Sequence, residues 1–242
     1  MTRLRILCAA VLLAGCGSVA RPASHAHPRR PVARFDGCVR LGATARTIAL
    51  RPRGATALTG VLMGTRSITV VLSDESDENL CSWLPFVGTL RAHGYSALLY
   101  DYVDPSEIAA DARAGAAAAL AVGGRRVLLM GASVGARASI KAASSHPPGV
   151  VGVISLSAER TVASDPADLI GPARKLTVPT LLISAREDPY LSGDTVALLG
   201  AVRARRKNAL VVPGSDHGTA LLSGSSGARV RAAVLSFLLR LG

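Results

Sequence analysis

The amino-acid sequence predicts an α/β fold: a mostly parallel central sheet with helices on both faces and no large cap domain. Short apolar runs rich in β-branched residues alternate with longer helical segments, and glycine or proline separates them. Such alternation is typical of a parallel sheet that is buried on both faces. With 49% apolar and 18% charged residues, the 242-residue chain is too hydrophobic to be disordered.

The strands are identified by β-branched apolar runs that end at turn residues. The turn at Pro52 to Gly54 joins the first two runs into a hairpin, and Ile68 to Leu72 is a buried run. The expected strands cover residues 46–50, 57–63, 68–72, 95–100, 127–130, 150–156, 180–184 and 209–212.

The helices are identified by their start and stop signals. Asp104 is expected to cap a helix with Pro105 at its first position and Glu107 three residues after the cap, and Gly123 ends that helix. Gly94 ends the helix before it. The expected helices cover residues 84–93, 104–122, 134–145, 165–175, 194–205 and 226–241.

The first 15 residues have the build of a secretory signal peptide. Arg3 and Arg5 precede an apolar run that is too short to span a bilayer. The run ends in Leu13-Ala14-Gly15-Cys16, which resembles the lipobox of bacterial lipoproteins, in which the cysteine carries the lipid. We therefore expect an exported protein, anchored to the cell membrane through a lipid on Cys16. An ordinary signal peptide cut nearby would give a secreted protein instead.

Residues 16–35 are expected to be a tether, and residues 36–242 a single domain. The tether is rich in Ser, Ala, Pro, His and Arg without an apolar period, so its two histidines are expected to be solvated rather than metal ligands. Cys38 and Cys81 remain in the domain and are expected to form a disulfide in an oxidising compartment. Two free buried thiols are the alternative.

The net charge of +12 does not by itself indicate a nucleic-acid partner. Aromatic residues make up only 3% of the chain, and the arginines are dispersed rather than gathered in a stripe. We therefore interpret the charge as a general surface property and expect no nucleic-acid partner.

A G-x-S-x-G motif lies between the expected strand 127–130 and the helix that follows it. Gly131-Ala132-Ser133-Val134-Gly135 fits a nucleophile elbow, in which a sharp turn holds the serine above the sheet. Gly131 and Gly135 would permit the close backbone approach that this turn requires. The alternative is a glycine-rich turn with a helix-capping serine.

An aspartate and a histidine follow two later strands, where catalytic groups of such sheets collect. Asp188 follows strand 180–184, and His217 follows strand 209–212. His217 would take the proton from Ser133, and Asp188 would orient the imidazole. Glu187 or Asp194 could be the acid instead, and Asp188 could be a turn former.

From about residue 57 onward the chain resembles the α/β-hydrolases, in particular small esterases and dienelactone hydrolases. The segments that carry the resemblance are 127–135, 178–189, 214–219 and 83–95, in the correct order. The Ser…Asp…His order of the three residues also matches this family. The resemblance implies a serine hydrolase that cleaves a carboxylic ester, or a related amide, thioester or lactone, through an acyl-enzyme and needs no metal or organic cofactor.

One segment departs from the family pattern. Family members usually carry His-Gly after the third strand, whereas this chain has Ser73-Asp74-Glu75. Position by position, the Glu75 and Val134 N–H groups would form the oxyanion hole. A Glu75 side chain that points inward would oppose the oxyanion. One that points outward, the expected outcome, would belong to a solvated acidic loop with Asp74, Asp77 and Glu78. A calcium loop is a third option, but the spacing fits no EF-hand.

The short segment between Ser157 and Thr180 leaves room for one helix, so we expect an open site for small or surface-presented acyl substrates. The acidic loop would disfavour anionic substrates. The competing function is a non-catalytic binding lipoprotein of the same fold. The altered 73–75 segment favours that alternative, and the Ser133, Asp188 and His217 constellation argues against it.

Overall fold

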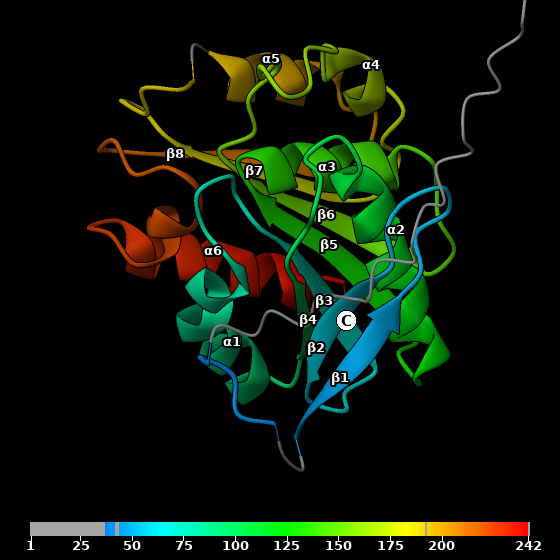
Figure 1. Cartoon of the computed structure of the whole chain (residues 1–242). Coiled ribbons are helices and arrows are strands. Elements are labelled where there is room, and N and C mark those ends of the chain that lie inside the picture. The colour runs from blue at the N-terminus through cyan, green and yellow to red at the C-terminus, as the bar shows by residue number, and fades with distance from the viewer. Residues whose placement is uncertain (1–36, 42–43, 192, 242) are drawn as a thin grey trace, which may run out of the picture.

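A computed structural model describes residues 37–41, 44–191 and 193–241, and shows one eight-stranded sheet in the order β1-β2-β4-β3-β5-β6-β7-β8 (Figure 1). Strands β3 to β8 run parallel to one another, while β2 runs antiparallel to both of its neighbours, β1 and β4. The expected fold class is therefore confirmed. The strands are β1 (Ala45–Leu50), β2 (Leu58–Met63), β3 (Ile68–Ser73), β4 (Ser96–Tyr100), β5 (Arg126–Ala132), β6 (Val150–Leu156), β7 (Thr180–Ala185) and β8 (Lys207–Val212).

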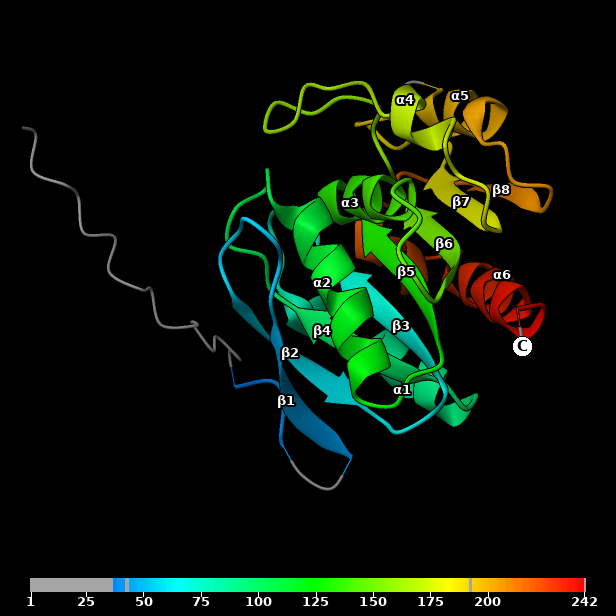
Figure 2. The same cartoon turned by 90° about the vertical axis from the view of Figure 1, so that its right-hand side faces the viewer.

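Two helical layers cover the sheet (Figure 2). One face carries α2 (Ile108–Ala121), α3 (Val134–Ala143), α4 (Ile170–Ala173) and α5 (Asp194–Ala201); the other carries α1 (Leu84–Ala92) and α6 (Gly227–Leu239). Each layer seals its own apolar core, because alternate residues of the buried strands point to opposite faces. Two 3₁₀ helices, Leu80–Trp83 and Gly218–Leu222, pack on the α1 and α6 side.

The strand order reverses beside β3. The chain leaves β3 through α1 to reach β4 on one side, and leaves β4 through α2 to reach β5 on the other side of β3. Ligands of open parallel sheets bind outside the carboxyl ends of the strands at such a reversal. Ser73 at the end of β3 lies opposite Gly131 of β5, which brings the two segments predicted to act on the substrate side by side.

The expected start of α2 is wrong by four residues. The carboxylate of Asp104 accepts a hydrogen bond from the Ser106 N–H at 2.8 Å and so closes a turn ahead of the helix. The Glu107 carboxylate accepts a hydrogen bond from Thr56 N–H, 51 residues earlier in the chain, at 3.3 Å. The helix therefore begins at Ile108.

The expected helix over residues 165–175 is also wrong, because only Ile170–Ala173 is helical there. The buried guanidinium of Arg137 donates to two backbone carbonyl oxygens of this segment, at 2.8 Å to Asp165 O and 3.0 Å to Ala167 O, and at 2.7 Å to Glu159 O ahead of it. Carbonyls that converge on one guanidinium do not all point along a common helix axis, as the carbonyls of an α-helix do. The segment is consequently an irregular loop on the α3 side of the sheet.

Helices α3, α5 and α6 end two to four residues earlier than expected.

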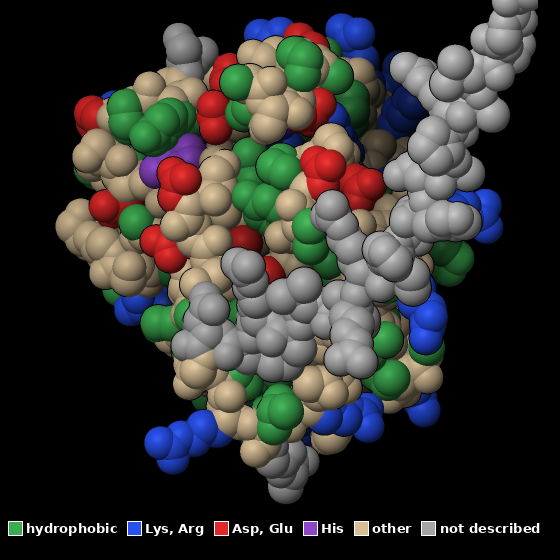
Figure 3. All heavy atoms as spheres, in the orientation of Figure 1, with side chains coloured by type: hydrophobic (Ala, Val, Ile, Leu, Met, Phe, Trp, Pro, Cys, Tyr) green, Lys and Arg blue, Asp and Glu red, His purple; other side chains and the backbone are tan. Residues whose placement is uncertain are grey.

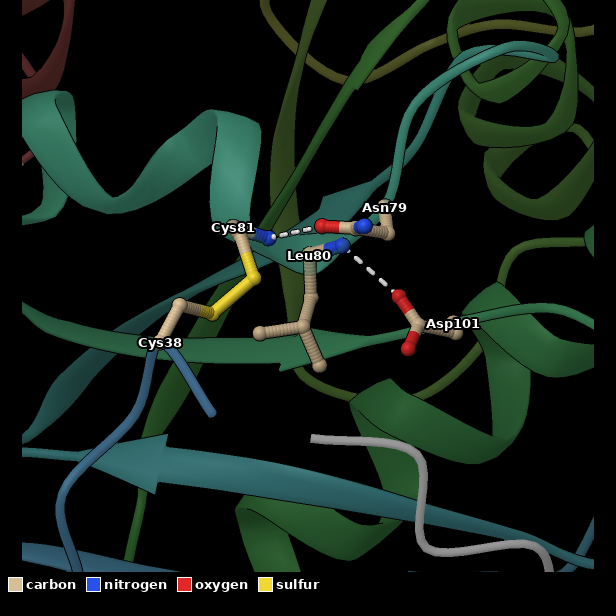
Figure 4. The surroundings of a disulfide bond; sticks show 5 residues. All are labelled: Cys38, Asn79, Leu80, Cys81 and Asp101. Carbon is tan, nitrogen blue, oxygen red and sulfur yellow. Dashed lines mark hydrogen bonds between the residues drawn. A yellow bond between two sulfur atoms is a disulfide. The ribbon is translucent and has the colours of Figure 1, made fainter. Parts of the chain in front are cut away.

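A disulfide joins Cys38 to Cys81, the pairing that the sequence favours (Figure 4). It connects the segment before β1 to the first 3₁₀ helix. The Asn79 side chain caps that helix by accepting from Cys81 N–H at 2.9 Å, and the neighbouring Leu80 N–H donates to Asp101 at 2.7 Å. The disulfide thereby holds the end of the acidic segment that follows β3.

The expected signal peptide, Cys16 and the tether to residue 35 lie outside the described residues. Within the described ranges, none of the helices has both the length and the apolar character needed to cross a bilayer.

Candidate active site

Ser133 occupies a strained turn between β5 and α3. Its backbone has φ 50° and ψ −116°, a left-handed conformation that costs a residue with a side chain of order 1–3 kcal/mol. The Ser133 N–H is held by Leu156 O of the neighbouring strand at 2.9 Å. The serine is thus kept at the carboxyl edge of the sheet at the end of β5.

Two glycines make this turn possible. A Cβ atom on Gly131 would lie 2.1 Å from Gly135 O, and one on Gly135 would lie 2.2 Å from Ser73 O. Neither distance is tolerable for a carbon atom in contact with backbone, so both positions exclude any side chain. The close approach at Gly135 also brings the start of α3 against the end of β3.

His217 lies against Asp188. The imidazole Nδ1 is 2.8 Å from Asp188 Oδ2 and 3.0 Å from Oδ1, and the Asp188 side chain is fully buried. Asp188 Oδ1 also accepts from Tyr190 N–H at 3.1 Å, so the aspartate forms a turn as well as binding the histidine. The Tyr190 ring packs at 4.6 Å from the imidazole.

The two other candidate acids are engaged elsewhere. Glu187 accepts from Gly214 N–H at 2.6 Å, and Asp194 accepts from Arg160 N–H at 3.0 Å. Neither carboxylate has a hydrogen bond to the imidazole of His217.

Ser157, which no sequence motif marks, joins Asp188 to the loop that carries His217. Its buried hydroxyl donates to Asp188 Oδ2 at 2.9 Å and accepts from Gly218 N–H at 3.1 Å. The backbone at Ser157 also has a positive φ of 55°. Through these two hydrogen bonds, Ser157 holds the Asp188 carboxylate in place against the loop that carries His217.

Glu75 does not belong to a solvated loop. Its side chain is only 8% exposed, and Oε1 accepts from Thr219 N–H at 3.0 Å and from the Thr219 hydroxyl. Asp74 is buried too, so the expectation of a solvated acidic loop is wrong for both residues and holds only for the exposed Asp77 and Glu78. The Glu75 carboxylate therefore faces the two Thr219 donors, on the loop that carries His217.

Burial raises the pKa of the Asp74 carboxyl well above its ordinary value, and the carboxylate of Asp101 raises it further. The nearby Trp83 indole lowers the pKa of Asp74, but its effect is smaller than that of burial. Asp74 therefore holds its proton to a higher pH than an ordinary aspartate does.

The two expected oxyanion-hole donors, Glu75 N–H and Val134 N–H, belong to residues that line the same cleft. In the part of the chain that the structure describes, neither N–H has a hydrogen-bond acceptor. Val134 N–H is at the first position of α3, where an amide has no partner within the helix.

The hydroxyl of Ser133 is directed toward Glu159, another residue that no sequence motif marks. Ser133 Oγ donates to Glu159 Oε1 at a distance of 3.4 Å. The described residues include no hydrogen bond between Ser133 and His217. Burial raises the pKa of Glu159, and this effect exceeds the lowering caused by His217 and Arg137.

Ser133, Glu159 and His217 line a cleft of about 510 Å³. Its walls include Ser133, His217 and Tyr190, together with four carboxylates and no lysine or arginine. On the face shown in Figure 3, acidic side chains are spread over the upper half, some of them close to a histidine, while lysine and arginine lie mostly around the periphery. The cleft is therefore locally acidic on a chain whose net charge is +12. The acids are Glu75, Asp77, Glu78 and Glu159.

No family model and no curated protein matches the sequence. Solved structures do match the fold. An esterase from Pyrococcus furiosus is 14% identical with a TM-score of 0.73, over 82% of this chain and 92% of that one. Est1E from Butyrivibrio proteoclasticus is 14% identical with a TM-score of 0.66, over 81% and 98%. A dienelactone hydrolase from Anabaena variabilis is 16% identical with a TM-score of 0.67, over 81% and 97%. The chain has the α/β-hydrolase fold.

Proposed function

We propose that this protein is an exported serine hydrolase that cleaves a carboxylic ester through an acyl-enzyme. The observation that carries the proposal is the His217–Asp188 pair, 2.8 Å from Nδ1 to Oδ2, because His217 lines the same cleft as the strained Ser133. A nucleophile, a base and a group that orients the base are the parts that acyl transfer requires. Proteins of similar fold are esterases and a dienelactone hydrolase, which supports hydrolysis as the reaction class.

In the proposed reaction, Nε2 of His217 removes the hydroxyl proton of Ser133 while Oγ forms a bond to the ester carbonyl carbon. The carbonyl π electrons move to its oxygen, which the Glu75 and Val134 N–H groups bind. When the tetrahedral intermediate collapses, the bond to the alcohol oxygen breaks and that oxygen takes the proton from Nε2. Water then attacks the acyl-enzyme by the same route and releases the carboxylic acid.

In this reaction Asp188 fixes the imidazole with Nδ1–H toward the carboxylate, which leaves Nε2 free to accept the serine proton. The contact between Ser133 and His217 would form when substrate turns the hydroxyl away from Glu159, since catalytic hydrogen bonds often tighten only in the substrate complex.

Export and lipid anchoring through Cys16 are part of the proposal. The signal-like residues 1–15 and the Leu-Ala-Gly-Cys sequence support them, and the Cys38–Cys81 disulfide suits an oxidising compartment. In this setting the substrate is a small or surface-presented acyl compound that reaches an open cleft.

Hydrolysis of short-chain methyl esters by the purified chain tests the proposal. We expect turnover that falls by at least about 10³-fold in Ser133→Ala and in His217→Ala, with an intact circular-dichroism spectrum. Asp188→Asn should fall by a similar factor, because it leaves the histidine in the wrong tautomer. Turnover that persists in Ser133→Ala would contradict the proposal.

The second candidate is a non-catalytic binding protein of the same fold. The hydrogen bond from Ser133 to Glu159, in place of His217, favours it. A folded protein without esterase turnover would support this candidate.

A further inference from the structure

Glu159 is the carboxylate that meets the candidate nucleophile. It follows β6 on the loop after Leu156, it is half-buried, and its Oε1 lies 3.4 Å from Ser133 Oγ. The other buried glutamate of the cleft, Glu75, is bonded to Thr219. The remaining two cleft acids, Asp77 and Glu78, are exposed at the cleft margin, so Glu159 is the acid placed against the reacting atoms.

No cation of the described chain pairs with the Glu159 carboxylate. The guanidinium of Arg137 donates to the Glu159 carbonyl oxygen at 2.7 Å and forms its ion pair with Asp165 at 2.8 Å. No lysine or arginine lines the cleft. A half-buried carboxylate whose hydrogen-bond partner is one neutral hydroxyl retains much of its capacity to bind a positive charge.

We propose that Glu159 binds a protonated amino group on the acyl part of the substrate, so that α-aminoacyl esters are the preferred substrates. This inference rests on the proposed function, because it assigns the acyl side of the reaction at Ser133.

The short distance between Ser133 and Glu159 selects the acyl side. An α-ammonium nitrogen is two bonds from the carbonyl carbon that Ser133 attacks, so it remains next to Oγ when the ester bond is attacked. The ammonium of a choline-type alcohol is four bonds from the same carbon and would project away from Oγ. A cation that contacts a carboxylate beside Oγ therefore belongs on the α carbon of the acyl group.

Binding of the ammonium would also release the nucleophile. The ammonium would donate to Glu159 Oε1 and take the place of the Ser133 hydroxyl, which would then be free to turn to His217. A neutral ester must break the Ser133–Glu159 hydrogen bond without replacing it. The preference is thus expected in kcat as well as in KM.

The test compares alanine methyl ester with methyl propionate, which lacks the amino group, and with N-acetylalanine methyl ester, which lacks the charge. For the wild-type full chain we expect kcat/KM for alanine methyl ester to exceed both others by about ten-fold or more, as for a charged hydrogen bond. In Glu159→Gln, the ratio between alanine methyl ester and methyl propionate should fall toward one. In the matched variant Glu78→Gln, which removes an exposed charge of the same cleft, the ratio should stay close to the wild-type value.

Three outcomes would overturn the inference. Hydrolysis of methyl propionate that depends on Ser133 but shows no preference for alanine methyl ester would refute it and leave the proposed function standing. If the ratio of kcat/KM between alanine methyl ester and methyl propionate fell equally in Glu159→Gln and Glu78→Gln, the preference would arise from the summed negative charge of the cleft and not from Glu159. A preference for propionylcholine that Glu159→Gln abolishes would place the cation on the alcohol side.

A measurement without variants covers the case in which Glu159→Gln fails to fold. L-alaninamide should slow labelling of wild-type Ser133 by a fluorophosphonate, and the uncharged propionamide should not at the same concentration. Equal protection by the two amides would overturn the inference. Absence of any labelling would instead contradict the proposed function.

Discussion

Glu75 Oε1 accepts a hydrogen bond from the Thr219 N–H at 3.0 Å across 144 residues of sequence. The bond ties the segment after β3, whose backbone is the candidate oxyanion donor, to the loop that carries His217. The Thr219 hydroxyl adds a second bond to the same oxygen. One side chain therefore fixes the relative position of two parts of the candidate active site, whereas the sequence pattern favoured a solvated side chain there.

Replacement of Glu75 tests this arrangement. Glu75→Ala leaves the two Thr219 donors without an acceptor, so we expect a loss of about 1–3 kcal/mol in the free energy of unfolding. Because His217 would shift, ester turnover should also fall by about ten- to hundred-fold. Glu75→Gln keeps the oxygen that accepts both bonds and should restore most of the turnover. Equal turnover in Glu75→Ala and wild type would contradict the positioning role.

Gly218 should not tolerate a side chain. Its φ is +55°, and an added Cβ would lie 1.7 Å from Glu75 Oε2. Gly218→Ala should therefore lower the free energy of unfolding by at least about 1–2 kcal/mol from backbone strain alone and also lower turnover. Gly88→Ala is the matched control, because Gly88 lies within α1 and a Cβ there meets nothing within 4 Å. It should raise stability by about 0.5–1 kcal/mol. Equal effects of the two substitutions in urea unfolding would refute this prediction.

Removal of the disulfide should destabilise the domain. The bond closes a loop between Cys38 and Cys81, 43 residues apart, for which the chain-entropy model gives about 4 kcal/mol. The double variant Cys38→Ser, Cys81→Ser should therefore unfold at a lower urea concentration than the oxidised protein. A reducing agent should shift the wild-type midpoint in the same direction and leave that of the double variant unchanged. Coincident midpoints for oxidised and reduced wild type would exclude this contribution.

Asp111 should make stability depend on pH. Burial, together with the nearby carboxylates of Glu107 and Asp104, raises its pKa to about 7 against the lowering by Arg113. Between the ordinary value of 3.8 and about 7, the unfolded chain ionises this group while the folded chain keeps it protonated. The contribution of Asp111 to stability consequently falls as pH rises, by up to about 1.4 kcal/mol per pH unit, and levels off above the folded pKa.

Asp111→Asn removes this titration. Its free energy of unfolding relative to wild type should therefore increase between pH 4.5 and pH 8, as measured by urea unfolding at both values. A difference between variant and wild type that is the same at the two pH values would show that the folded pKa of Asp111 is not raised.

The local pattern of the sequence was sufficient to predict the strands, because each buried strand is an apolar run between turn residues. It also placed Ser133, Asp188 and His217 at the ends of parallel strands, and such ends share one edge of the sheet. The prediction of a helix over 165–175 was wrong because Arg137, about 30 residues earlier in the chain, binds backbone carbonyls of that segment.

Glu75, Ser157 and Glu159 illustrate what the local pattern could not predict. A charged residue is expected at the surface unless it is paired, and the partner of Glu75 lies 144 residues away. Ser157 and Glu159 have no motif around them. The one available signal was their place just after β6, because residues that follow each parallel strand approach the same edge.

Labelling of Ser133 by a fluorophosphonate tests the central claim most directly. We expect the probe to modify the purified chain at Ser133, as mapped by mass spectrometry, and we expect Ser133→Ala and His217→Ala both to abolish the modification. A folded protein that remains unlabelled, or labelling of Ser133 that persists in His217→Ala, would contradict a nucleophile activated by this histidine.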